Sequence, residues 1–149
     1  MKNYWKTAMW SMALILFTFM AASCGDDDED EVPALRSKVY TLASADTTGL
    51  TNVTGTVTFD EVDASKTTVT IDLVNAPAGG VHPAHIHDGE KTTNGQVAFA
   101  LTDVVNSKSV STVTQSYDQL INYDGYVNVH LSADSLDVII ANTNIGSNE

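Results

Sequence analysis

Hydrophobic and polar residues alternate along much of the chain beyond residue 35, which is the pattern of β-strands that bury one face and expose the other. In residues 68–73, aliphatic side chains at the odd positions oppose threonine and aspartate at the even positions. The alternation is regular in four segments, 53–59, 68–73, 96–101 and 126–131, and less regular in 36–45, 82–88, 110–116 and 137–143. The pattern therefore predicts eight strands.

Turn sequences separate these segments. Runs such as "NAPAGG", "DGEKTTNG" and "NYDG" contain the glycine, proline and asparagine residues that favour turns. Only "SYDQLINY", residues 116–123, has helical spacing, and we expect it to form a short helix at one end of the fold. We therefore predict an all-β fold, an antiparallel immunoglobulin-like β-sandwich with one short helical segment.

The first 24 residues have a different character. Lys2 and Lys6 precede a long uncharged, apolar run that ends in small residues and Cys24, as in a secretory signal. The run is also about long enough for a single-pass membrane anchor. Cys24 is the only cysteine and directly follows the apolar run, which resembles a bacterial lipoprotein signal, whose cysteine is lipidated. A free structural cysteine is the alternative.

Six consecutive acidic residues follow, in "GDDDEDE" at 25–31. Such a run repels itself and stays solvated, so we expect a tether or plain spacer. It also resembles the acidic run that directs some Gram-negative lipoproteins to the cell surface. We therefore expect an outer-membrane lipoprotein, facing either the cell exterior or the periplasm.

The charge of the remaining chain excludes one class of partner. After the acidic run, 13 acidic residues face five basic ones, a formal net charge of −8. Such a surface repels nucleic acid. The expected organisation is a signal peptide at 1–23, a lipidated cysteine and tether at 24–35, and one β-sandwich domain at 36–149.

The sequence "VHPAHIHDG", residues 81–89, contains three of the four histidines. On a strand, residues two apart point the same way, so His85 and His87 project from one face with Cα atoms about 7 Å apart. Alternation places His130, in "YVNVHL", on the polar side of its own strand. Neighbouring strands would bring these three imidazoles together as candidate ligands for copper or zinc.

Other residues could support such a site. His82 precedes Pro83 and could supply a fourth ligand or remain a loop residue. Asp88 could accept a hydrogen bond from an imidazole, and Asn128 and Tyr126 share the face of His130. Without metal, the imidazoles would simply bond to nearby carbonyl and hydroxyl groups.

Other chemistry finds little support in the sequence. The "DGEKTTNGQ" segment does not have the spacing of an EF-hand calcium loop, so we expect a solvated hairpin loop. No Gly-x-Ser-x-Gly elbow or glycine-rich phosphate motif is present, and Cys24 is assigned to the anchor. We therefore predict no catalytic nucleophile.

The segments "AHIHDG", "GQVAFALTD" and "YDQLINYDGYVNVHL" together resemble the CHRD domain, first described in chordin and common in bacterial exported proteins. The resemblance covers about residues 36–145. It implies a sandwich likened to copper/zinc superoxide dismutase, with Greek-key topology, in which His85, His87 and His130 would take copper-ligand roles.

The negative charge of the chain favours a binding protein over an enzyme, because its field would oppose an anionic substrate. Fold likeness does not establish activity. We expect a lipid-anchored, non-catalytic binding or envelope module whose partner is an unidentified protein or glycan. The alternatives are a copper- or zinc-dependent redox protein and an adhesion or scaffold domain without a ligand.

Overall fold

The computed structural model describes residues 34–45 and 52–149. The expected signal peptide, Cys24 and the acidic tether lie outside these residues. Pro33–Glu149 forms one compact unit of the chain. Among the described residues, no helix has the length and hydrophobicity needed to cross a bilayer.

Antiparallel strands make up nearly the whole domain. Each of the eight predicted segments contains a strand; segment 82–88 is divided between the short strand β4 and β5, and the two-residue strand β7 is added. The elements are β1 (Ser37–Ser44), β2 (Thr54–Asp63), β3 (Lys66–Val74), β4 (Val81–His82), β5 (Ala84–Asp88), β6 (Val97–Ala100), β7 (Val104–Val105), β8 (Lys108–Val113), α1 (Tyr117–Ile121), β9 (Asp124–Ser132) and β10 (Ser135–Gly146). The predicted all-β class is confirmed.

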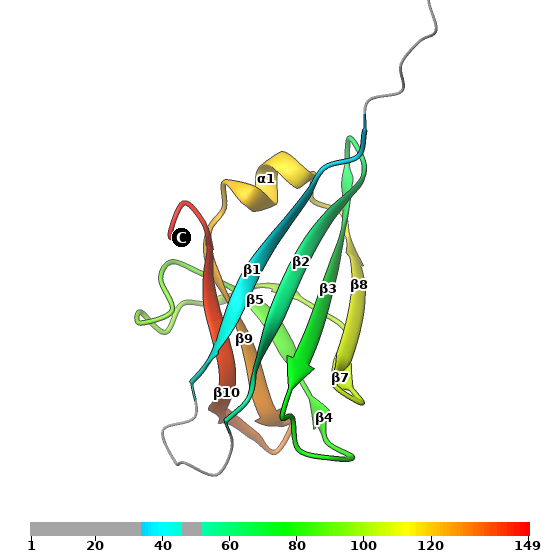
Figure 1. Ribbon diagram of the computed structural model, residues 1–149. Helices are drawn as coiled ribbons and strands as arrows, with labels where there is room; N and C mark the ends of the chain where they lie inside the picture. Colours follow the sequence, from blue (N-terminus) through cyan, green and yellow to red (C-terminus); the bar gives the residue numbers. More distant parts are fainter. Residues whose placement is uncertain (1–33, 46–51) are drawn as a thin grey trace, which may run out of the picture. The chain divides into compact units, whose positions relative to one another are not determined.

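The strands hydrogen-bond in the order β4-β7-β8-β3-β2-β1-β10-β9-β5-β6. β1 pairs with β2 along most of its length and then with β10 through Ala43 and Ser44. β4 pairs with β7, whereas β5, which starts two residues after His82, pairs with β9 and β6. Pro83 lies between β4 and β5, where its missing N–H removes no ladder bond. The pairing partners therefore change at two places, within β1 and between β4 and β5. These two places divide the sheet into two halves, one containing β1, β2 and β3 and the other containing β10, β9 and β5 (Figure 1).

One hydrophobic cluster joins the two halves. It contains Phe59 and Ile71 from the β1–β2–β3 half and Ile86, Val127 and Ile140 from the β10–β9–β5 half, each fully buried. Side chains from the two halves of one sheet can share a core only if the sheet folds back on itself. The superoxide-dismutase-like Greek key stays a prediction.

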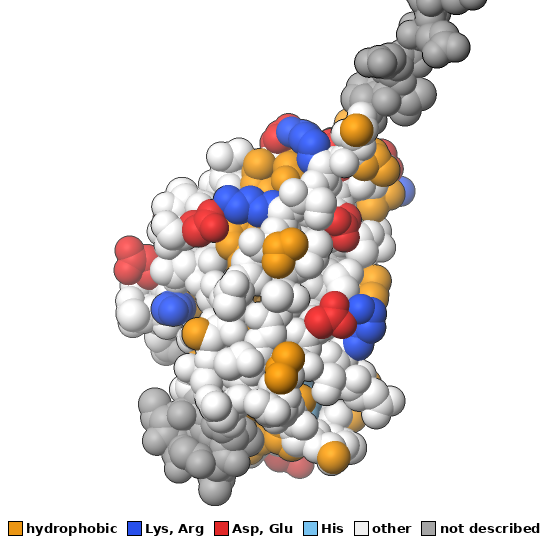
Figure 2. All heavy atoms as spheres, viewed as in Figure 1, with side chains coloured by type: hydrophobic (Ala, Val, Ile, Leu, Met, Phe, Trp, Pro, Cys, Tyr) orange, Lys and Arg blue, Asp and Glu red, His pale blue; other side chains and the backbone are white. Residues whose placement is uncertain are grey.

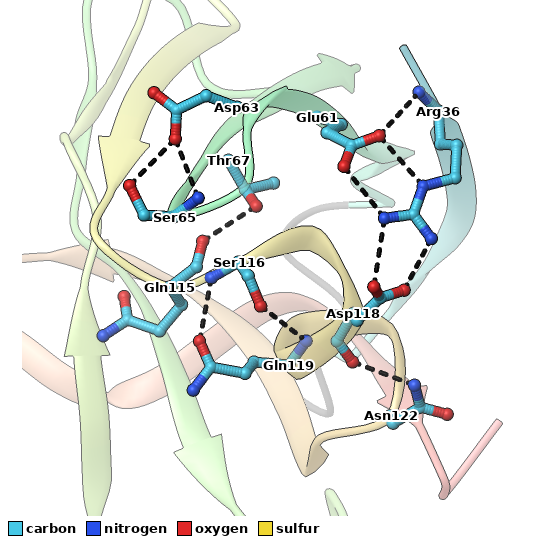
Figure 3. Close-up of polar contacts among 10 residues, drawn as sticks. All are labelled: Arg36, Glu61, Asp63, Ser65, Thr67, Gln115, Ser116, Asp118, Gln119 and Asn122. Atoms are coloured by element: carbon cyan, nitrogen blue, oxygen red, sulfur yellow. Dashed lines mark hydrogen bonds and ion pairs between the residues drawn. The ribbon is translucent and has the colours of Figure 1, made fainter. Parts of the chain in front are cut away.

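The helix α1 closes one end of this core, as expected from residues 116–123. Ser116 and Gln119 form a reciprocal capping box, which satisfies backbone N–H groups at the helix start. The guanidinium of Arg36 binds both Glu61 on β2 and Asp118 on α1, at 2.8 and 2.6 Å (Figure 3). These contacts fasten the start of β1 to the helix end of the domain.

The face formed by β1, β2 and β3 shows no concentrated site. Figure 2 shows that basic and acidic side chains lie beside one another here and that hydrophobic side chains are dispersed. One such pair is Lys108 and Asp72, 2.8 Å apart and exposed. Exposed pairs of this kind contribute little to stability.

Candidate metal centre

The neighbouring strands β5 and β9 supply the candidate ligands. In their antiparallel ladder His85 lies opposite Asn128, and His87 lies opposite Tyr126. The intervening Ile86 points into the core and is fully buried. The alternation seen in the sequence therefore puts the histidines on the face of this half-sheet that points away from the core.

His130 comes from β9 and joins the same face. Each of His85, His87 and His130 offers one ring nitrogen, and these nitrogens all lie within 4.8 Å of one another. The ring of His85 lies 5.1 Å from that of His130 and 5.8 Å from that of His87, measured between centroids. The three imidazoles therefore lie close together, as the sequence predicted.

Two of the imidazoles are held by backbone carbonyls. Nδ1 of His87 lies 2.9 Å from the Gly95 oxygen, and Nδ1 of His130 lies 2.6 Å from the Leu136 oxygen. A carbonyl can only accept, so each Nδ1 carries the hydrogen and each Nε2 keeps a free lone pair. Both Nε2 atoms are buried and have no partner. This is how proteins orient neutral histidine for a metal ion.

The acceptor for His87 depends on a close approach of two backbone segments. A Cβ atom on Gly95 would lie 1.8 Å from the carbonyl oxygen of Asp88, so only glycine fits here. The Gly95 N–H donates to the Tyr126 hydroxyl at 2.9 Å. The Tyr126 ring in turn stacks on His87 with an interplanar angle of 16°. Tyr126 therefore supports His87 through both its ring and its hydroxyl.

The acceptor for His130 comes from an irregularity in β10. The register of β10 against β9 shifts between Ser135 and Ile139 and again before Ala141. Such a bulge bends the strand and redirects its backbone groups. The Leu136 carbonyl lies within this irregular segment and receives the His130 Nδ1–H.

The environment of His85 and His130 favours the neutral form of these two imidazoles. Burial lowers the pKa of His85, and the neighbouring His87 lowers it further. Burial also lowers the pKa of His130, with smaller contributions from the other two histidines. Neutral rings retain the lone pairs that a metal ion needs.

The polar face is more covered than the sequence suggested. His87 and His130 are only 8% and 5% exposed, whereas His85 is half-buried. We expected a wet face, but β9 is buried on both sides from Gly125 to His130. The 89–96 loop and the β10 irregularity supply the carbonyls that cover it.

Two expected contributors lie elsewhere. His82 is fully buried on the core-facing side of its strand, and its Nδ1 lies 2.8 Å from the Leu131 oxygen, so it does not join the three histidines. Asp88 accepts a hydrogen bond from the Tyr123 hydroxyl rather than from an imidazole. Burial, followed by this bond to Asp88, raises the pKa of Tyr123 to about 12.

Sequence reasoning missed the carbonyl acceptors at Gly95 and Leu136. A carbonyl leaves no trace in residue type, so nothing in the sequence marks Leu136. Gly95 follows Asn94, whose φ of 53° is left-handed, and an Asn-Gly pair is a recognisable turn signal.

Fold and site together define a class: an antiparallel all-β domain with a three-histidine face on neighbouring strands. The family model for the CHRD domain matches residues 28–135, well over half of the chain. The chain belongs to the CHRD domain family. This membership favours a non-catalytic, extracellular binding module. No curated protein matches the sequence.

Proposed function

We propose that this chain is an exported, lipid-anchored CHRD module that binds one copper or zinc ion through His85, His87 and His130. One observation carries the metal proposal: one ring nitrogen from each of the three histidines lies within 4.8 Å of the others, and the Nε2 atoms of His87 and His130 are buried without a partner. A buried polar atom without a partner is costly, and a bound ion would offset that cost.

The donor chemistry fits either metal. Three neutral nitrogens suit copper and zinc, whereas calcium and magnesium require oxygen ligands. A three-histidine set leaves a coordination position open to a further ligand. When bound, the ion would supply Lewis acidity or, for copper, a redox couple.

Binding is favoured over catalysis by the surroundings. The domain carries a net negative charge. The field of this charge repels anionic substrates instead of guiding them to the site. A redox assay on the copper-loaded protein tests the enzyme alternative directly.

Metal content is the primary experiment for this proposal. Full-length chain purified in detergent should bind one equivalent of Cu²⁺ or Zn²⁺, and a His85→Ala/His87→Ala variant should bind none. Asp88→Asn is the matched control, because Asp88 lies next to His87 in sequence but contacts Tyr123. Equal metal content in the wild type and the double variant would refute the site.

The anchor is tested separately. Cys24→Ser should release the protein from membranes or leave its signal unprocessed. Unchanged mass and membrane extraction would refute lipidation. Protease treatment of intact cells would then distinguish a surface-exposed domain from one that faces the periplasm.

A further inference from the structure

A cavity of about 240 Å³ lies over the three histidines. Its other walls are of two kinds. The polar side chains are Asn94, Asn128 and Asp137, and the apolar ones are Val97, Leu136 and Ile139. No lysine or arginine is among these lining residues. The cavity therefore combines apolar surface with hydrogen-bond acceptors and lacks a cation that would hold an anion.

Asn128 is the informative member of this lining. It is only 4% exposed, lies directly opposite His85, and its Oδ1 atom is buried without a hydrogen-bond partner. Buried amide oxygens are nearly always paired, because an unpaired one loses its hydration without replacement. A cavity ligand that donates an N–H or O–H group would satisfy this oxygen.

Several ligand classes fit poorly. The carboxylate of Asp137 and the unpaired oxygen of Asn128 both disfavour anions such as azide or acetate. A primary amine is protonated near neutral pH and then has no lone pair for a metal ion.

A neutral imidazole meets each requirement. One ring nitrogen carries a lone pair, the other carries a hydrogen, and the flat ring faces are apolar enough for Val97 and Leu136, which are 52% and 48% exposed. We propose that this cavity binds a neutral imidazole group, with Asn128 accepting its N–H and the open metal position accepting its lone pair. This inference rests on the proposed metal site.

Three small probes test it on the full-length, Co²⁺-loaded protein in detergent, whose visible spectrum reports a change of ligands. The first is 4-methylimidazole, which is the histidine side chain itself. Imidazole is the second, and 1-methylimidazole, which keeps the lone pair and loses the N–H, is the third. We expect the first two to bind roughly tenfold more tightly than the third, as one hydrogen bond implies.

Variants assign the preference to one atom. Asn128→Leu keeps the shape and removes the acceptor, so the preference should disappear. Asn128→Asp retains an acceptor oxygen and should preserve it. If either variant fails to fold, the comparison among the three probes on the wild-type protein still decides.

The outcomes separate the two proposals. A protein that takes up no Co²⁺, Cu²⁺ or Zn²⁺ overturns both. A metal-loaded protein that binds all three probes equally, or none of them, overturns the imidazole ligand and leaves the metal site standing. A preference that survives in Asn128→Leu overturns the assignment to Asn128.

Discussion

The Tyr126 hydroxyl provides the sharpest test of how the site is held. It accepts the Gly95 N–H at 2.9 Å, and the carbonyl of that same glycine accepts the His87 Nδ1–H at 2.9 Å. Tyr126→Phe keeps the ring that stacks on His87 and removes only the first of these two bonds. A lone hydrogen bond of this kind contributes about 1 kcal/mol to stability.

We expect two effects from this one atom. The free energy of unfolding of the metal-free protein should fall by about 1 kcal/mol, measured by urea titration. The affinity for Zn²⁺ should fall by about 10-fold, within the 10- to 100-fold range for residues that orient a ligand histidine. A chelator competition titration measures the second effect.

Tyr123→Phe is the matched control. It also removes one tyrosine hydroxyl, but that hydroxyl donates to the exposed Asp88, outside the histidine set. We expect the zinc affinity of this control to equal that of the wild type. The reasoning is refuted if Tyr126→Phe lowers stability while zinc affinity stays at the wild-type value.

Three further predictions concern the same region. Gly95→Ala should weaken zinc binding more than Tyr126→Phe does, because the new Cβ would displace the loop from the Asp88 carbonyl, and calorimetry with zinc would show it. Ile86→Ala should lower the free energy of unfolding by about 2–5 kcal/mol, because Ile86 is fully buried; a loss under 1 kcal/mol in urea titration would contradict this burial. The lowered pKa values of His85 and His130 mean that the unfolded chain takes up protons near pH 6.5, before the folded one does. Stability of the metal-free protein should therefore be complete above about pH 6.5 and decline below it, and this part of the decline should be absent when both histidines are replaced by glutamine.

Much of the fold was predictable because period-two alternation records burial directly. Residues 68–73 bury Val69 and Ile71 and leave the intervening Thr70 partly exposed, as the pattern indicated. The short strand β7 was missed, because two residues cannot show a period, and the predicted strand 82–88 is divided at Pro83 into β4 and β5. The change of partners within β1 also leaves no periodic signal, since both ladders accept the same alternation.

The site was predictable where side chains alone define it. Alternation placed His85 and His87 together, and the position of His130 on a polar strand face added the third. His82 was misplaced because its relation to Pro83 was treated as a loop feature. In the structure His82 belongs to the separate strand β4, and His82, Pro83 and Ala84 are buried in succession, so the alternation of β5 does not extend to it.

Backbone groups limited what the sequence could predict. The carbonyls of Gly95 and Leu136 fix two imidazoles, but their directions depend on a close loop approach and an irregular ladder. The loop that contains Gly95 and the irregular part of β10 also cover the outer face of β9. The sequence pattern predicts that this face is exposed to solvent, but β9 is buried on both faces. This burial depends on tertiary contacts, which the pattern of a single strand does not record.

The central claim is that the three histidines form one metal site, and metal stoichiometry tests it most directly. Full-length protein, stripped with chelator and then dialysed against Cu²⁺ or Zn²⁺, should retain one ion per chain by elemental analysis. The His85→Ala/His87→Ala variant should retain none, while Asp88→Asn should retain one. Retention well below one ion per chain in the wild type, with no thermal shift on adding either metal, would contradict the claim.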